Sequence, residues 1–211
     1  MDKKNVSMND VAVAAGVSLK TVSRVINEPD SVRESTRDKV HAAMEALGFR
    51  TNFAARSLKL GRYGCIGVVM FHLWGGAVDM IDGIADAAEE RGFALTMIKK
   101  RAGEKMTLAD AARRMSQLPV DGMIFNLRQM VDDFDTFEAP KDLKTVIITP
   151  MEHPTCSTVS DDQEGGARMA CEYFLNHGHK NVYFVSGKKE SLPSQCRMKG
   201  WRAALEARGI E

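Results

Sequence analysis

The sequence lacks the features that would indicate a secreted, membrane-bound or metal-dependent protein. Its four cysteines, Cys65, Cys156, Cys171 and Cys196, are widely separated and form no C-x-x-C pair, so neither a zinc site nor a redox motif is indicated. No apolar run approaches the roughly 20 residues that a membrane span requires, and the polar start M-D-K-K-N is unlike a signal peptide. We therefore expect a reduced, cytoplasmic protein with no cofactor, no metal and no membrane partner.

Catalytic motifs and a dominant charge are also missing. There is no G-x-S-x-G elbow or phosphate-loop glycine pattern, and His153, His177 and His179 have no matched nucleophile. The net charge is only +1, with 10 Lys and Arg against 7 Asp and Glu in residues 1–60 and 19 against 21 in the remainder. A weakly basic front on a slightly acidic body fits a DNA-binding head on a separate domain, although this asymmetry is too small to stand as evidence by itself.

The most informative segment that is present spans residues 9–27 and reads N-D-V-A-V-A-A-G-V-S-L-K-T-V-S-R-V-I-N. It predicts two short helices that meet at Gly16, because a tight turn often needs the positive φ that glycine allows. Ser18 occupies the N-cap position of the second helix. That helix presents hydroxyl, amide and cationic side chains next to one apolar residue: Leu19, Lys20, Thr21, Ser23, Arg24 and Asn27. This pattern favours a DNA-binding helix–turn–helix over an ordinary surface hairpin.

The flanking residues extend this motif into a three-helix headpiece. Ser7 with Asp10 resembles a capping box at the start of the first helix. A third helix is expected over residues 34–47, with Gly48 closing it, since apolar residues recur there at helical spacing. Residues 50–60 are also helical in pattern, but so short a helix is only marginally stable alone.

From Cys65 onward, strands alternate with helices, which predicts a doubly wound parallel α/β domain. The expected strands are C-I-G-V-V-M-F, A-L-T-M-I, G-M-I-F, T-V-I-I, S-T-V-S and V-Y-F-V. The expected helices cover about 78–91, 108–118, 164–177 and 194–208. Such sheets bind ligands at the carboxyl ends of their strands.

An ordered series of motifs resembles the lactose/galactose repressor family over nearly the whole chain. The motifs are G-V-S-x-x-T-V-S-R-V-I-N, T-R-D-K-V-H-A-A-M-E-A-L-G-F, A-R-S-L, I-G-V-V-M, G-I-A-D-A-A-E-E-R-G-F, V-D-G-M-I-F, E-Y-F-L-N-H-G-H-K-N-V-Y-F-V-S-G and R-M-K-G-W-R-A-A-L-E-A-R-G-I. The resemblance implies an α plus α/β fold: a helix–turn–helix headpiece with a hinge helix, then an incomplete domain like periplasmic binding proteins. The expected division is headpiece 1–49, hinge and linker 50–64, first subdomain 65–161 and a truncated second subdomain 162–211.

The predicted DNA contacts fall into two groups. Leu19, Lys20 and Arg24 are expected to read base edges, because the first residues of a recognition helix reach the major groove and an arginine suits guanine. The polar residues Ser18, Thr21, Ser23, Asn27 and Thr36 are expected to contact phosphates or cap helices.

The resemblance also implies hinge contacts with the minor groove. Ala55 and Leu58 match family positions that enter this groove, and Asn52 matches a backbone contact. Plain helix packing is the alternative for Leu58. The family usually has proline before this asparagine, whereas this chain has Thr51, which leaves the hinge less ready to fold.

A ligand site is expected at the strand ends. The resemblance matches Arg197 to an arginine that contacts sugar hydroxyls. Phe71 and Trp74 follow the first strand, where an aromatic face could stack on a sugar, although core or dimer-interface packing is the alternative. Glu152 and Asp162 follow later strands as polar partners. The chain has H-L-W-G-G where the family often has N-P-F-F, so the ligand cannot be named.

The resemblance implies a sequence-specific transcriptional regulator, by default a repressor. A homodimer would bind a pseudo-palindromic double-stranded operator, and a small-molecule effector, with a sugar as the favoured class, would change its affinity. Two alternatives stay open: a truncated regulator that keeps its DNA-binding head but lacks an effector response, and a solute-binding protein.

Overall fold

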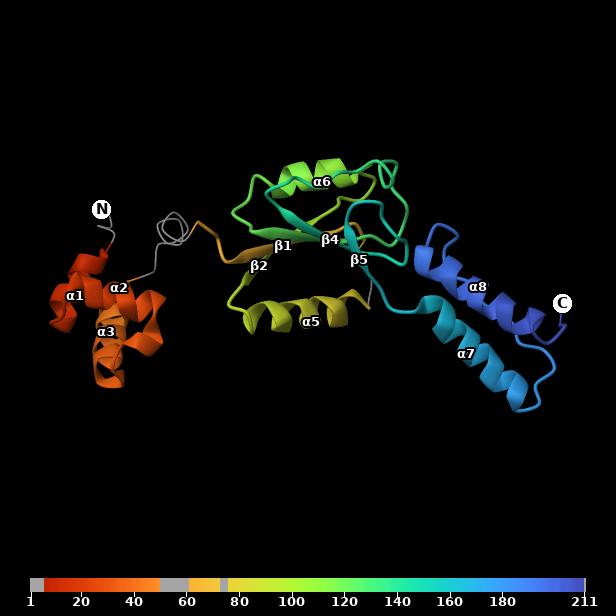
Figure 1. Cartoon of the computed structure of the whole chain (residues 1–211), viewed down its shortest axis with the longest axis horizontal. Helices are drawn as coiled ribbons and strands as arrows, with labels where there is room; N and C mark the ends of the chain where they lie inside the picture. The colour runs from red at the N-terminus through yellow and green to blue at the C-terminus, as the bar shows by residue number, and fades with distance from the viewer. Residues whose placement is uncertain (1–5, 50–60, 73–75, 211) are drawn as a thin grey trace. The chain divides into compact units, whose positions relative to one another are not determined.

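The computed structural model describes residues 6–49, 61–72 and 76–210, and the chain divides into two compact units, Met1–Gly61 and Arg62–Glu211. Each unit is described by itself (Figure 1). Within the described ranges, no helix combines the length and the apolar character that crossing a lipid bilayer would require.

The first unit is a small bundle of helices around one apolar core. Its elements are α1 (Met8–Ala15), α2 (Leu19–Asn27), the short 3-10 helix η1 (Pro29–Ser31) and α3 (Glu34–Leu47). The core consists of small side chains contributed by all three α-helices: Val11, Ala12, Val22, Val25, Val40 and Ala43. The predicted three-helix headpiece is therefore confirmed.

The local signals that define these helices act as the sequence predicted. Ser7 and Asp10 form a reciprocal capping box at the start of α1. Gly16 ends α1 with φ of 65°, in the left-handed region that favours glycine. Ser18 then caps α2, its Oγ accepting a hydrogen bond from the Thr21 backbone N–H at 3.1 Å. Gly48 closes α3 with φ of 63°.

The second unit contains a five-stranded parallel sheet of order β2-β1-β3-β4-β5. The strands are β1 (Cys65–Met70), β2 (Ala94–Lys99), β3 (Gly122–Asn126), β4 (Lys144–Ile148) and β5 (Ser157–Val159). Helices α5 (Ala77–Glu89) and α6 (Leu108–Met115) cover opposite faces of the sheet (Figure 1). This arrangement confirms the predicted doubly wound α/β fold.

Side chains of β1 alternate between two apolar clusters, as a buried parallel strand requires. Val69 and Phe71 belong to the larger cluster, which includes the apolar face of α6. Val68 and Met70 belong to a smaller cluster with Ala77 of α5. The sheet is thus covered on both faces.

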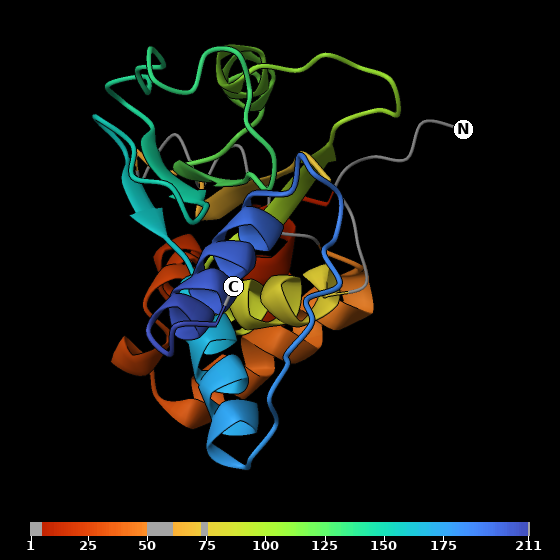
Figure 2. The same cartoon turned by 90° about the vertical axis from the view of Figure 1, so that its right-hand side faces the viewer.

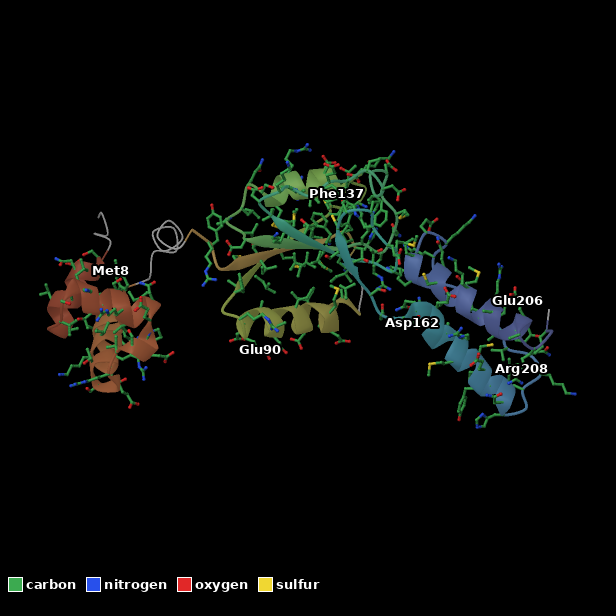
Figure 3. All side chains as sticks on the ribbon, in the orientation of Figure 1. Met8, Glu90, Phe137, Asp162, Glu206 and Arg208 are labelled. Atoms are coloured by element: carbon green, nitrogen blue, oxygen red, sulfur yellow. The ribbon has the colours of Figure 1, made fainter. Side chains whose placement is uncertain are left out.

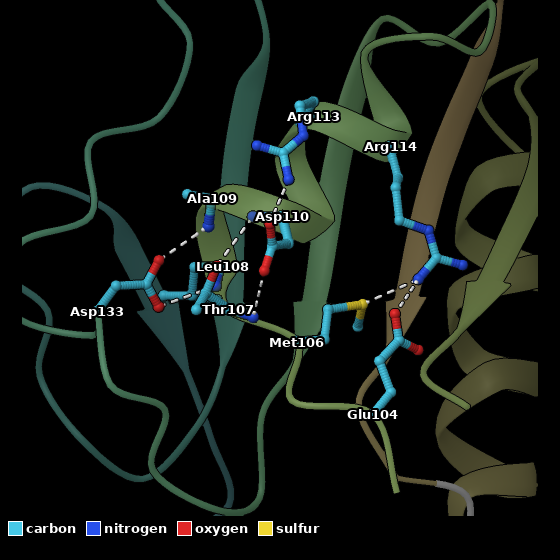
Figure 4. Close-up of polar contacts among 9 residues, drawn as sticks. All are labelled: Glu104, Met106, Thr107, Leu108, Ala109, Asp110, Arg113, Arg114 and Asp133. Atoms are coloured by element: carbon cyan, nitrogen blue, oxygen red, sulfur yellow. Dashed lines mark hydrogen bonds and ion pairs between the residues drawn. The ribbon is translucent and has the colours of Figure 1, made fainter. Parts of the chain in front are cut away.

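Helix α6 is fixed at its N-terminus by two carboxylates (Figure 4). Thr107 and Asp110 form a capping box. The Asp133 carboxylate accepts hydrogen bonds from the backbone N–H groups of Leu108 and Ala109, each at 2.9 Å. These contacts satisfy N–H groups that have no partner within the helix.

Beyond the sheet, α7 (Gln163–Asn176) and α8 (Leu192–Glu206) pack side by side, as both views show (Figures 1 and 2). Their contact is close because Gly200 of α8 lies against the backbone of Glu164, where an added Cβ would be 2.0 Å from the carbonyl oxygen. A small cluster of Cys171, Leu175, Ala204 and Leu205 lies between the two helices.

The predicted strand V-Y-F-V is wrong. Residues 182–185 have no regular secondary structure, and Tyr183 and Val185 are 86% and 94% exposed. Inward-facing and exposed side chains still alternate in this segment, since Phe184 stacks on Trp201 with the ring centroids 5.8 Å apart. The Trp201 indole N–H also donates to the Val182 carbonyl at 2.9 Å. A parallel strand also needs a neighbouring strand, and the described sheet contains none that pairs with this segment.

Candidate nucleic-acid interface and ligand site

Helix α2 has one buried face and one exposed face. Val22 and Val25 are fully buried in the headpiece core. Lys20 and Arg24 are exposed and lie one turn apart, so they share a face, and Leu19 beside them is 48% exposed. An exposed apolar side chain flanked by two cations suits a DNA groove, where it can contact a thymine methyl while the cations reach bases or phosphates.

The remaining polar residues predicted on α2 are engaged within the helix. The Ser18 and Thr21 hydroxyls lie 2.9 Å apart, and the Asn27 side-chain amide donates to the Ser23 carbonyl at 2.8 Å. Thr36 is half-buried in the first turn of α3. Ser18, Thr21, Ser23 and Asn27 therefore make local hydrogen bonds, whereas Leu19, Lys20 and Arg24 are exposed. The predicted hinge contacts Asn52, Ala55 and Leu58 lie outside the described residues.

Residues 63–65 are anchored to the sheet through one carboxylate. Asp121 accepts hydrogen bonds from three successive backbone N–H groups, those of Tyr63 at 2.7 Å, Gly64 at 2.5 Å and Cys65 at 3.3 Å. The start of β1 is thereby tied to the start of β3. This anchor was not predicted, although Asp121 belongs to the quoted V-D-G-M-I-F motif.

The structure distributes the predicted ligand-site residues among different roles. Phe71 is only 3% exposed and packs edge-on against Phe125, which favours the core-packing alternative. Asp162 lies at the start of α7 (Figure 3). It caps this helix, because its carboxylate accepts a hydrogen bond from the Gly165 N–H at 2.7 Å. Glu152 is exposed after β4, while Arg197 is half-buried on α8 and donates to the Gln163 side chain. Trp74 lies outside the described residues.

Sequence reasoning missed a group of polar residues at the carboxyl edge of the sheet. The buried polar or charged residues in the described ranges are Asn126 at the end of β3, Thr149 just after β4 and Ser194 in the first turn of α8. Backbone bonds join these segments: the Leu127 N–H donates to the Ile148 carbonyl and the Leu192 N–H to the Arg128 carbonyl. A polar residue ending an otherwise apolar run, as in I-F-N and I-I-T, was the available signal.

Residues at this edge also have shifted pKa values and buried polar atoms without a hydrogen-bond partner. Burial lowers the pKa of His72, and Lys100 and Lys188 lower it further. Burial also lowers the pKa of Arg128, an effect that Asp161 opposes and Arg197 reinforces. Asn126 Oδ1 and His72 Nδ1 are buried without a hydrogen-bond partner. Polar atoms left unsatisfied and grouped at a strand edge are typical of a binding site.

The fold and these two candidate sites define the class of protein: a helix–turn–helix unit attached to a parallel α/β unit. Comparison with known families gives the same division. The family model described as bacterial regulatory proteins, lacI family, matches residues 7–52. The model for periplasmic binding proteins and the sugar binding domain of the LacI family matches residues 75–211. The chain belongs to the LacI family of bacterial regulators.

Individual proteins similar to this chain support the same family assignment. The chain is 30% identical to the HTH-type transcriptional repressor PurR of Photobacterium profundum, over 97% of this chain and 62% of that protein. It is 27% identical to the ribose operon repressor of Escherichia coli, again over 97% and 62%. The lac repressor bound to ONPG in the repressed state is 26% identical, with a TM-score of 0.75 over 99% of this chain and 64% of that one. The chain thus spans about three fifths of the length of these relatives.

Proposed function

We propose that this chain is a sequence-specific transcriptional repressor whose affinity for operator DNA is set by a small-molecule effector. Two copies bind a pseudo-palindromic double-stranded operator, each headpiece in one major-groove half-site. A single headpiece reads too few base pairs for a unique site, and a two-fold symmetric pair doubles the sequence that is read. Such a regulator acts on chromosomal DNA, so we place it in the cytoplasm.

The observation that carries this proposal is the outward face of α2. Leu19, Lys20 and Arg24 are exposed on a helix whose opposite face, Val22 and Val25, is locked into the headpiece core. The cap at Ser18 and the bend at Gly16 fix where this helix begins. A cationic row held on a short capped helix after a glycine bend is suited to major-groove recognition.

The effector half of the proposal rests on the α/β unit. Its family model is that of sugar-binding domains, and relatives include a ribose operon repressor. We propose a sugar or a sugar derivative at the carboxyl edge of the sheet, with Arg197 in contact with it. Asp121 would transmit the change, because it ties the residues that follow the hinge to β3. We retain the division into headpiece 1–49, hinge and linker 50–64, and subdomains 65–161 and 162–211; limited proteolysis would test these boundaries.

The decisive experiment is selection of binding sites from random DNA by the full 211-residue chain. We expect a palindromic consensus. Arg24→Ala should then weaken binding to the selected site by about 5- to 150-fold, since one good base contact contributes about 1–3 kcal/mol. Binding to scrambled DNA should change far less.

Lys39→Ala is the matched control, because Lys39 is an exposed cation of the same headpiece but lies on α3. This variant should weaken binding to the selected DNA and to scrambled DNA slightly and equally. Selection that yields no consensus, or an Arg24→Ala chain that keeps its preference for the selected site, would refute the proposal.

A further inference from the structure

The carboxylate of Asp121 lies where three successive backbone N–H groups converge. Tyr63 donates to its Oδ1 at 2.7 Å, while Gly64 and Cys65 donate to its Oδ2 at 2.5 and 3.3 Å. Successive N–H groups that converge in a turn form a concave anion site of the kind that binds phosphate groups in many proteins. Here the anion is a side chain of the same chain. We call Asp121 and residues 63–65 together the latch.

Gly64 gives the latch its shape. In an extended chain successive N–H groups point to opposite sides, so a bend in the backbone is needed to aim three of them at one acceptor. Gly64 has a φ of 65°, in the left-handed region that other residues rarely adopt. A Cβ on Gly64 would meet only the Gly92 carbonyl oxygen, at 3.8 Å, which is an ordinary contact. The backbone conformation therefore requires glycine here, and the available space does not.

Two backbone hydrogen bonds complete the attachment of this segment. The Asp121 N–H donates to the Cys65 carbonyl at 2.8 Å, so Asp121 both donates to residues 63–65 and accepts from them. The Ala94 N–H donates to the Gly64 carbonyl at 2.8 Å. Since Ala94 begins β2 and Asp121 precedes β3, the residues that lead into β1 are fixed to the amino ends of both neighbouring strands.

The latch stands where the second compact unit begins, since Tyr63 is the second residue of that unit. An open latch would free residues 63 and 64 from the sheet, and two extended residues span up to about 7 Å. That length corresponds to about two base pairs along a duplex. A closed latch therefore limits how far apart two chains can place whatever they carry on the preceding residues.

We propose that Asp121 is a positioning residue for operator binding. By closing the latch it fixes the point at which each chain leaves the sheet, and it thereby sets the half-site spacing that a pair of headpieces reads. This inference rests on the proposed function, because it needs two headpieces on one operator. Asp121 acts through residues 63–65 and does not itself contact DNA.

The test measures how tightly the full chain binds duplexes that carry the selected half-site twice. The centre of the duplex is shortened or lengthened one base pair at a time, up to half a helical turn, which is about five base pairs. The wild-type chain should prefer one spacing by about tenfold or more, because a pair of headpieces that cannot reach both half-sites loses the second interaction. A duplex with a single half-site reports the affinity of one headpiece.

Asp121→Asn should reduce this spacing preference by about fivefold or more. The amide has no charge, and it offers N–H donors where the latch needs an acceptor. Binding to the single half-site should change little, since α2 is untouched. Asp142→Asn is the matched control, because Asp142 is exposed and precedes β4 much as Asp121 precedes β3. That variant should keep the spacing preference of the wild-type chain.

Gly64→Ala opens the latch from the other side and leaves the Asp121 carboxylate in place, because alanine disfavours a positive φ. It should broaden the accepted spacings as Asp121→Asn does, and the double variant should add little, since both changes open one latch. Gly103→Ala is its control: Gly103 also has a positive φ, 77°, and open space around it, but it lies in the loop after β2.

A spacing preference that survives both Asp121→Asn and Gly64→Ala would overturn the inference. So would variants that weaken binding to every duplex alike, since that result indicates a structural role only, or a wild-type chain that binds all spacings equally. The site selection described above separates this failure from that of the proposed function. A chain that selects a palindromic site but tolerates every spacing refutes only the inference, whereas a chain that selects no site refutes the proposed function itself.

Discussion

Two short apolar segments of the second unit, residues 122–126 and 182–185, have similar sequence patterns and different structures. The first, G-M-I-F-N, is β3, paired on one side with β1 and on the other with β4. The second, V-Y-F-V, follows α7 and has no regular secondary structure. Phe125 in the first is fully buried, whereas Tyr183 in the second is 86% exposed. The two segments therefore differ in their neighbours more than in their residues.

A local sequence pattern determines which side chains of a segment face inward, whereas pairing with a neighbouring strand determines whether the segment becomes a strand. In residues 182–185 the alternation of inward and outward side chains is still present, since Phe184 packs on Trp201 while its neighbours are exposed. The backbone ladder is what this segment lacks. Ladder hydrogen bonds come from adjacent strands, so an apolar run becomes a strand only where another strand lies beside it.

The largest contrast should come from truncating the aromatic residue in each segment. Phe125→Ala should lower the free energy of unfolding of the second unit by about 3–5 kcal/mol, because it opens a cavity between the sheet and α6. Tyr183→Ala should change it by less than about 0.5 kcal/mol, since an exposed side chain loses little packing. Urea denaturation followed by circular dichroism measures both values.

Amide hydrogen exchange provides the control, because it reports on each segment separately. Amides of residues 122–126 should exchange slowly and those of 182–185 rapidly. Equal protection of the two segments, or a similar loss of stability in the two variants, would mean that residues 182–185 are paired in solution.

Most of the fold was predictable, because strong local signals agreed with the tertiary structure. The bend at Gly16, the caps at Ser7 and Ser18 and the helix over residues 34–47 all depend on contacts within a few residues. The strand predicted at V-Y-F-V was wrong, because strand formation depends on a neighbour that the local sequence does not encode.

The candidate sites were less predictable for the same reason. Lys20 and Arg24 could be placed on one face because helical spacing is a local property. Asn126 and Arg128 could not be found in this way, since their surroundings depend on α8, which begins more than sixty residues later in the chain and contacts the Arg128 carbonyl through the Leu192 N–H. Phe71 follows an apolar strand, and only its contact with Phe125 favours core packing over ligand binding.

A smaller contrast concerns how residues 162–211 are held together without a strand ladder. The close contact at Gly200 makes α7 and α8 the main packing unit there. Gly200→Ala should lower the free energy of unfolding by about 1–3 kcal/mol, because the new Cβ overlaps the backbone of Glu164, which cannot move aside as a flexible side chain would.

Gly166→Ala is the matched control on α7. An added Cβ there meets nothing within 4 Å, so the better helix former should stabilise the helix by about 0.5–1 kcal/mol. Both changes are measured by urea denaturation followed by tryptophan fluorescence, as Trp201 lies on α8. A tolerated Gly200→Ala would show that the two helices are not in close contact in solution.

The smallest difference is between the capped start of α6 and the start of α8, where Ser191 makes no side-chain capping bond. The capping box of Thr107 and Asp110 fixes the start of α6. Hydrogen bonds from the backbone and side chain of Thr107 lower the pKa of the Asp110 carboxyl below its ordinary 3.8. A carboxyl whose pKa is lower in the folded state stabilises that state above the unfolded pKa, and this contribution is lost as the pH falls through the folded value.

Asp110→Asn should therefore reduce stability at pH 7 and flatten its decline below about pH 4, where the carboxyl of the unfolded wild-type chain takes up a proton before that of the folded chain. Asp82→Asn, which removes an exposed carboxylate from the middle of α5, should leave that decline unchanged. Ser191→Ala should alter neither value, since its side chain makes no capping bond. Urea denaturation at pH 7 and at pH 3 gives all of these differences, and equal pH dependence in the wild-type and Asp110→Asn chains would show that this carboxylate does not fix the start of α6.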